Sequence, residues 1–257
     1  MATIKILGSC SGTEPMPERH HTSFVLTAFD RNYFFDAGEN CSYSSHLSGI
    51  DLTKTRAVFI SHTHFDHIGG LMGLFWVIRK VSGFYKRPVA DGEIKLFIPD
   101  VAVWEHILGA LKLTEGDFKC SFGITADTPK FGQFYKDENL TVSAFESHHL
   151  LKAADGHCRS FSYRIETDEK SVVFSGDIKN MDDLLSPVGD GCDILLCETG
   201  HHTVKDVCDF AEAHNVKRLV FVHHGRAILK NAPEVAEAIK ECKIPVDISF
   251  DGFTLDV

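Results

Sequence analysis

Alternating apolar residues predict three strands at the start of the chain. They occupy the ranges 2–7, 22–27 and 32–36, and polar residues separate the second run from the third. Apolar alternation bounded by turn-forming residues is typical of β-strands. We therefore expect an opening meander, with a hairpin turn at Asp30, Arg31 and Asn32.

Four later apolar runs also predict strands. They lie at 57–60, 141–145, 171–174 and 218–222 and are rich in β-branched and aromatic residues. Histidines follow the first, second and fourth runs, and Asp177 follows the third. Functional side chains are therefore expected at the ends of these strands.

Helical spacing appears between the strands. Residues 71–78 are mostly apolar and predict a buried helix, and a second helix is expected from Trp104 to Leu113. The ranges 206–214 and 233–240 carry apolar residues three and four positions apart, which is typical of amphipathic helices. Strands and helices in two successive halves indicate a layered α/β class.

Length and composition favour one domain over residues 1–257. With 257 residues and 44% hydrophobic content, the chain is able to bury a full core. The first residues enter a strand without a charged leader, and no apolar run reaches the roughly 18 to 20 residues that a membrane span requires. We expect a soluble cytoplasmic protein with no membrane partner.

Charge and cysteine content exclude two functional classes. The formal net charge of −10 argues against a generally basic nucleic-acid binder, because contacts to phosphate supply most of the affinity in such proteins. The eight cysteines include no close pair, so neither a zinc ribbon nor a secreted disulfide framework is indicated.

The strongest chemical signal lies directly after the strand at 57–60. Four metal-capable side chains fall within six positions there: His62, His64, Asp66 and His67. Imidazoles and carboxylates are ligands that Zn²⁺ prefers. His62 and His64 point to one ion, and the other pair points to a second. Asp36, at the end of an earlier predicted strand, is expected to start a loop near the same metal face.

The pattern His-x-His-x-Asp-His resembles the signature of the metallo-β-lactamase superfamily. The later ligand positions of that family are matched in order by a histidine after 141–145, by Asp177 after a glycine, and by a histidine after 218–222. The resemblance implies a four-layer αββα sandwich with the metals at one edge of two packed sheets. Spacing in related sequences favours His149 over His148 and His223 over His224. The disfavoured pair is left open as outer partners of the ligands or as solvent-facing groups.

Within the superfamily the sequence is most similar to the ribonuclease Z branch and its phosphodiesterase relatives. The similarity is carried by residues 7–12, by 160–165, by Cys197-Glu198-Thr199 and by His201-His202-Thr203. The long Gly/Pro-rich arm with which that branch holds tRNA has no counterpart here. The resemblance therefore implies phosphodiester hydrolysis, acting on an RNA end or on a small nucleotide-like molecule.

The resemblance also implies a set of site residues around two divalent ions, with zinc favoured and manganese or iron as alternatives. The first ion takes His62, His64 and His149, the second takes Asp66, His67 and His223, and Asp177 bridges them. A hydroxide bridging the ions would attack phosphorus. Three residues are expected to assist catalysis: Asp66 at the nucleophile, His201 as proton donor, and Glu198 holding His201.

Several alternatives stay open at this point. The same hydroxide could attack the carbonyl of a lactone or thioester. Glu198 and His201 could instead support the start of a helix, and Arg19, Arg164 and Arg226 are either phosphate ligands or solvated groups. The basic aromatic segment 79–87 suits single-stranded nucleic acid or a solvated loop. A homodimer is expected from related enzymes, without a segment that identifies the interface.

Overall fold

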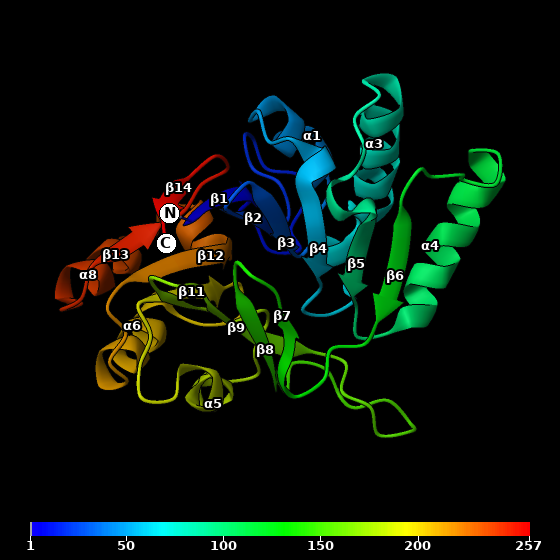
Figure 1. Ribbon diagram of the computed structural model, residues 1–257. Helices are drawn as coiled ribbons and strands as arrows, with labels where there is room; N and C mark the ends of the chain where they lie inside the picture. Colours follow the sequence, from blue (N-terminus) through cyan, green and yellow to red (C-terminus); the bar gives the residue numbers. More distant parts are fainter. Residues whose placement is uncertain (1) are drawn as a thin grey trace.

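Two mixed β-sheets pack face to face and carry helices on their outer faces (Figure 1). The computed structural model describes residues 2–257. The first sheet has the order β14-β1-β2-β3-β4-β5-β6 and the second the order β13-β12-β11-β10-β9-β8-β7. This arrangement confirms the predicted four-layer αββα sandwich.

The strands of the first sheet come from the first half of the chain and its last residues. They are β1 (Ala2–Gly8), β2 (Ser23–Ala28), β3 (Arg31–Phe35), β4 (Thr55–Phe59), β5 (Glu93–Phe97), β6 (Gly123–Asp127) and β14 (Thr254–Asp256). The second sheet contains β7 (Gly132–Lys136), β8 (Thr141–Glu146), β9 (Phe161–Glu166), β10 (Ser171–Phe174), β11 (Ile194–Thr199), β12 (Leu219–His224) and β13 (Val246–Ile248).

The helices divide between the two outer faces (Figure 1). Against the first sheet lie α1 (Cys41–Leu47), α3 (Leu71–Phe84) and α4 (Val101–Thr114), and against the second lie α5 (Leu185–Val188), α6 (Val204–Ala213) and α8 (Pro233–Glu241). Shorter helical segments are α2 (Phe65–Ile68), α7 (Arg226–Leu229), η1 (Leu52–Lys54), η2 (Ala90–Gly92) and η3 (Met181–Leu184). No helix in residues 2–257 has the length and apolar character needed to cross a membrane.

An aromatic core fills the space between the sheets. Phe35 and Phe59 of the first sheet stack with ring centroids 4.9 Å apart, and Phe35 meets Phe174 of the second sheet edge-on at 6.5 Å. All three side chains are fully or almost fully buried. Offset and edge-to-face aromatic pairs add to the stabilisation from burial alone. The contacts lock the two sheets at one separation, and so fix the edge where the predicted site residues meet.

The structure corrects the predicted hairpin turn. Phe29 and Asp30 adopt positive φ values of 45° and 72°, and Arg31 and Asn32 already pair with β2. A two-residue hairpin with both central residues at positive φ has the twist that flanking strands need. Asn32 lies in the strand because its buried amide donates to the carbonyl of Asp51.

Helix α3 and strand β12 also extend beyond their predicted ends. Helix α3 continues to Phe84, six residues beyond the predicted end at Ile78, and no proline interrupts this stretch. Strand β12 continues through His223, which was predicted to lie beyond it. His223 has φ 48°, next to a register shift in the pairing of β11 with β12. The strand therefore bends at this residue without ending there.

Candidate metal centre

The motif at 61–67 lies where β4 ends, against strand β9 of the other sheet. The Tyr163 hydroxyl donates a 2.7 Å hydrogen bond to the carbonyl of Ile60, and the Phe161 N–H donates one of 2.9 Å to the carbonyl of Ser61. These bonds satisfy backbone carbonyls that no longer take part in the β4 ladder. The backbone of the motif is thus held by both sheets.

Helix α2 begins inside the motif. His64 is its N-cap residue with an extended backbone (φ −65°, ψ 150°), and Asp66 and His67 lie in its first turn. His62 and His67 are completely buried, whereas His64 is exposed. Because the backbone changes from extended to helical at His64, His62 and His64 belong to one cluster of possible ligands and Asp66 and His67 to a second.

The first group joins both sheets. His62 and His64 follow β4, His149 follows β8, and their ligand atoms lie with that of Asp177 within 4.8 Å of one another. His149 Nε2 is 3.4 Å from His64 Nδ1 and 3.6 Å from Asp177 Oδ2. Ring nitrogens and a carboxylate oxygen at these separations suit a single cation between them.

The second group also joins both sheets. Asp66, His67 and His223 have ligand atoms within 4.8 Å of one another. His223 Nε2 lies 3.2 Å from Asp66 Oδ2, and His67 Nε2 lies 3.5 Å from the same oxygen. Both groups therefore combine residues that follow β4 with a histidine from the second sheet, which comes from the end of β8 in the first group and from β12 in the second.

Asp177 lies between the two groups. Its Oδ1 is 3.4 Å from both His67 Nε2 and His223 Nε2, while its Oδ2 is 3.7 Å from His62 Nε2. Gly176 before it has φ 54°, and a Cβ there would lie 2.7 Å from the carbonyl oxygen of Phe161. Glycine is thus required for the turn that directs the carboxylate into the site.

Several buried polar atoms in the cluster have no hydrogen-bond partner among residues 2–257. They include His62 Nε2, His67 Nε2 and Asp177 Oδ1. Buried polar atoms are normally paired, and an unpaired one points to a group that the protein is built to bind. Two imidazole nitrogens and a carboxylate oxygen turned to the same space are the donor set of a divalent metal, so the residues fit such an ion.

Asp36 contacts this cluster through His67 and Ser61. Its fully buried carboxylate lies 2.7 Å from His67 Nδ1 and accepts hydrogen bonds from the backbone N–H and the hydroxyl of Ser61, at 2.7 and 2.8 Å. A metal-binding histidine commonly donates its second ring N–H to a carboxylate, which fixes the tautomer and the ring orientation. The sequence placed Asp36 near the metal face but did not predict this contact.

Glu198 is buried at the end of β11 and collects three hydrogen bonds. It accepts from the N–H of Ile178 at 2.9 Å, from the N–H of His201 at 2.9 Å and from His201 Nδ1 at 2.8 Å. Burial acts to raise the pKa of Glu198, but the neighbouring rings of His201 and His223 hold that pKa well below its usual range. Glu198 is therefore a carboxylate that holds both the backbone N–H and the ring of His201.

His201 lies beside the cluster, and its ring nitrogen Nδ1 is hydrogen-bonded to Glu198. The hydrogen bond to Glu198 raises the pKa of His201, and partial burial opposes the shift. Its side chain is 44% exposed, and its ring centroid lies 4.9 Å from that of His149. Because Nδ1 is held by Glu198, Nε2 is the atom left to exchange a proton. Helix α6 is capped by Thr203, which leaves Glu198 and His201 outside the helix start.

The two disfavoured histidines point away from the cluster. His148 Nδ1 lies 2.5 Å from Asp183 Oδ1, and the side chain of His148 is 60% exposed. His224 is fully buried and bonds the carbonyl of Ser249 through Nε2 at 2.8 Å. Burial lowers the pKa of His224 to about 3, so it is neutral near pH 7. His149 and His223 are thus the members of each pair that face Asp177.

The three arginines considered as phosphate ligands are each engaged elsewhere. Arg19 donates to Ser9, Arg226 pairs with both oxygens of Glu14, and Arg164 donates to three carbonyls near the end of α5. In the basic segment 79–87, Arg79 and Lys80 both pair with Glu115. Two of the four cations of this segment therefore share a single carboxylate within the protein.

The comparisons with known proteins agree with this architecture. A model of the family described as "Anti-Pycsar protein Apyc1" matches residues 2–240. The ribonuclease Z of Treponema pallidum is 44% identical over 77 residues, which cover 30% of this chain and 24% of that relative. The ribonuclease Z of Methanothermobacter thermautotrophicus is 22% identical over 301 aligned positions, which cover 100% of this chain and 97% of that relative. The chain thus matches about a quarter of the first relative and almost all of the second.

Solved structures share the whole fold. The metallo-β-lactamase fold protein YhfI from Bacillus subtilis superposes with a TM-score of 0.74 at 17% identity, covering 99% of this chain and 98% of that one. The short form of human tRNase Z gives a TM-score of 0.74 at 19% identity and covers 99% of both chains. The fold is therefore the metallo-β-lactamase fold, and the predicted resemblance to the ribonuclease Z branch is confirmed.

Proposed function

The chain belongs to the family described as "Anti-Pycsar protein Apyc1", and from its candidate metal centre and its ribonuclease Z relatives we propose that it is a metal-dependent hydrolase acting as a phosphodiesterase. Two relatives carry the name ribonuclease Z, and a ribonuclease cleaves phosphodiester bonds. The position of Asp177, with one carboxylate oxygen facing each histidine group, carries the proposal. It supplies the shared ligand that a two-metal site requires.

The proposed centre holds two divalent ions. His62, His64 and His149 would hold the first, Asp66, His67 and His223 would hold the second, and Asp177 would serve as a ligand to both. Zinc suits this imidazole-rich set, and manganese or iron are the alternatives that elemental analysis distinguishes. When bound, the two cations lower the pKa of the attacking water and neutralise charge on the phosphoryl oxygens.

Protein side chains perform the remaining steps. Asp66, between His67 and His223, orients the attacking water. His201 gives a proton from Nε2 to the departing oxygen, and Glu198 keeps His201 protonated by accepting from Nδ1. A positioned acid near its working pKa contributes about 10²–10⁴-fold to such a reaction.

The substrate is an RNA end or a small nucleotide-like diester, and a cavity next to His201 is large enough for the small diester. A cavity of about 600 Å³ lies beside His201 and is walled by α6, α7 and α8. This size falls within the usual range of small-molecule sites. The segment between Asp100 and Leu140, which contains no Gly/Pro-rich arm, contributes α4 and the edge strands β6 and β7. We also propose that residues 1–257 form one domain, because the side chains of both sheets share one central core.

The test is hydrolysis of three phosphodiesters with added Zn²⁺ or Mn²⁺. We would compare bis-p-nitrophenyl phosphate, a dinucleoside monophosphate and a 3′-extended precursor tRNA, each beside the Asp177→Ala variant. Turnover of the two small diesters alone supports a small-molecule phosphodiesterase, and turnover of the tRNA as well supports an RNA-end nuclease. Turnover of a lactone or thioester, with none of the three diesters cleaved, would overturn the proposal.

A further inference from the structure

Two of the segments of the second sheet that carry proposed ligands, the loops of His149 and Asp177, follow strands that are not neighbours. His149 follows β8 and Asp177 follows β10, and β9 lies between these strands. Neighbouring strands lie about 4.8 Å apart, so the ends of β8 and β10 are separated by roughly 10 Å. The ladders with β9 place the two strand ends, but no strand pairing joins the two loops directly, although His149 Nε2 and Asp177 Oδ2 come within 3.6 Å.

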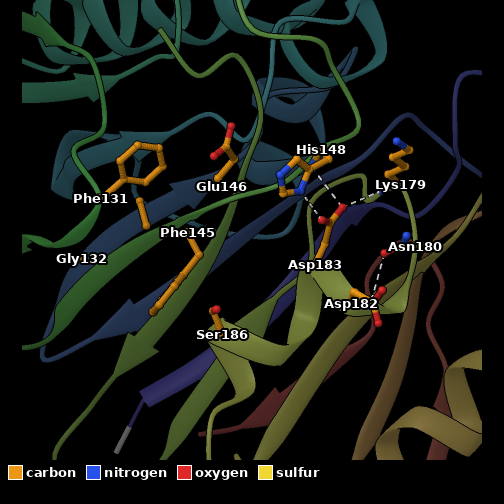
Figure 2. A pocket seen from close by; sticks show the side chains of 11 residues that line it. Phe131, Gly132, Phe145, Glu146, His148, Lys179, Asn180, Asp182, Asp183 and Ser186 are labelled. Atoms are coloured by element: carbon orange, nitrogen blue, oxygen red, sulfur yellow. Dashed lines mark hydrogen bonds and ion pairs between the residues drawn. The ribbon is translucent and has the colours of Figure 1, made fainter. Parts of the chain in front are cut away.

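Asp183 in η3 connects the two loops through a buried carboxylate. Its Oδ2 accepts from the backbone N–H of His148 at 3.1 Å and from that of Lys179 at 2.8 Å, and its Oδ1 lies 2.5 Å from His148 Nδ1 (Figure 2). The side chain of Asp183 is 3% exposed. Hydrogen bonds to a charged acceptor are roughly twice as strong as neutral ones. Asp183 is thus a charged clamp with one bonded partner in each loop.

The positions of the two backbone donors matter for the metal centre. His148 directly precedes His149, and Lys179 follows Asp177 by two residues. The Ser147 hydroxyl also donates to the carbonyl of Asp177, which adds a second link between the same loops. A shift at either donor would therefore move a ligand of the proposed first ion.

We propose that Asp183 is a positioning residue of the metal centre, which holds His149 and Asp177 at the separation that one cation requires. This inference rests on the proposed metal centre and is independent of the substrate. Each of the two loops that Asp183 joins provides a ligand for the first ion, His149 from one and Asp177 from the other. For the second ion, these loops provide Asp177 alone. Loss of the clamp is therefore expected to weaken the first site more than the second.

Metal binding measured without turnover tests this inference. Co²⁺ would be titrated into metal-free wild type, Asp183→Ala and Asp183→Asn, with the two sites followed by visible absorption and by elemental analysis after gel filtration. Replacing an outer partner of a metal ligand costs about 10–100-fold in affinity, and we expect a loss of this size at the first site in Asp183→Ala. The Asn variant keeps one acceptor oxygen and is expected to fall between the alanine variant and wild type.

The neighbouring Asp182 gives a matched control. It lies in the same helical segment with its side chain exposed, so Asp182→Asn is expected to bind both ions as wild type does. His148→Ala removes the ring contact but keeps the backbone donor to Asp183, and a smaller loss is expected. Equal weakening of both sites in the Asp183 variants, or unchanged binding in all of them, would overturn the positioning role. Absence of metal binding by wild type would instead reject the proposed metal centre.

Discussion

The carboxylate of Asp36 lies 2.7 Å from Nδ1 of His67, and both side chains are fully buried. The contact leaves His67 Nε2 as the ring atom that faces Asp177. Orientation of His67 therefore depends on a residue 31 positions earlier in the chain, directly after strand β3.

Asp36→Asn is expected to weaken metal binding. The amide keeps the shape of the carboxylate but loses its charge, and it no longer accepts equally from His67 and Ser61. Loss of such an outer partner typically costs 10–100-fold in metal affinity or activity. Competition with a chelator of known affinity measures the change. Ser61→Ala, which keeps the backbone N–H donor to Asp36, is the milder control, and wild-type metal affinity in Asp36→Asn would contradict the orienting role.

His201→Ala is expected to slow hydrolysis in a manner that depends on the leaving group. An alkoxide needs a proton to depart, so a dinucleoside monophosphate should lose about 10²–10⁴-fold in kcat. The p-nitrophenolate ion departs without a proton, and bis-p-nitrophenyl phosphate should lose far less. Steady-state rates on the two substrates measure the difference. An equal loss on both would assign His201 to binding or structure and not to proton donation.

Glu198→Gln is expected to move the alkaline limb of the pH–rate profile. The hydrogen bond to Glu198 raises the pKa of His201, so the acid form of His201 persists to higher pH in wild type. Removing the charge of Glu198 lowers that pKa, and activity that needs protonated His201 is then lost at lower pH. Profiles of kcat against pH for the dinucleoside monophosphate report the shift. A limb that stays in place would show that another group controls it.

The two sheets also meet through a polar contact between Tyr33 and Asp137. The hydroxyls of Tyr33 and Tyr135 each donate a 2.7 Å hydrogen bond to Oδ2 of Asp137, and Tyr33 is fully buried. Asp137→Ala would leave buried hydroxyls without an acceptor, at about 1–3 kcal/mol for each unsatisfied group. We expect the free energy of unfolding to fall by about 3 kcal/mol, measured by urea denaturation. The exposed Asp168→Asn is the control, and a loss no larger than its own would contradict this role of Asp137.

The sequence predicted most of the strands that present the site, because ligands and apolar strands adjoin each other along the chain. The motif at 61–67, His149, Asp177 and His223 all come directly or shortly after buried apolar runs, and the structure brings them to one edge. The choice between adjacent histidines is settled by tertiary contacts: Asp183 turns His148 away, and Ser249 holds His224.

Contacts between distant segments could not be predicted in the same way. Asp183 lies among ordinary polar residues, and nothing in its local pattern shows that its carboxylate reaches back to His148. The hairpin at Phe29 and Asp30 was misplaced because Asn32 resembles a turn residue, whereas its side chain is satisfied inside the sheet. In both cases the decisive partner lies far away in sequence.

The proposed ligands come from both sheets, which gives the metal ions a mechanical as well as a chemical consequence. The motif at 61–67 follows strand β4 of the first sheet, whereas His149 and Asp177 follow strands of the second sheet and His223 lies in its strand β12. Bound ions would act as crosslinks between the halves of the sandwich. A ligand present at 100 times its dissociation constant stabilises the folded state by about 2.7 kcal/mol. Separation of the sheets and release of the ions would then be one coupled event, so the cell's metal supply would help to set the lifetime of the folded protein.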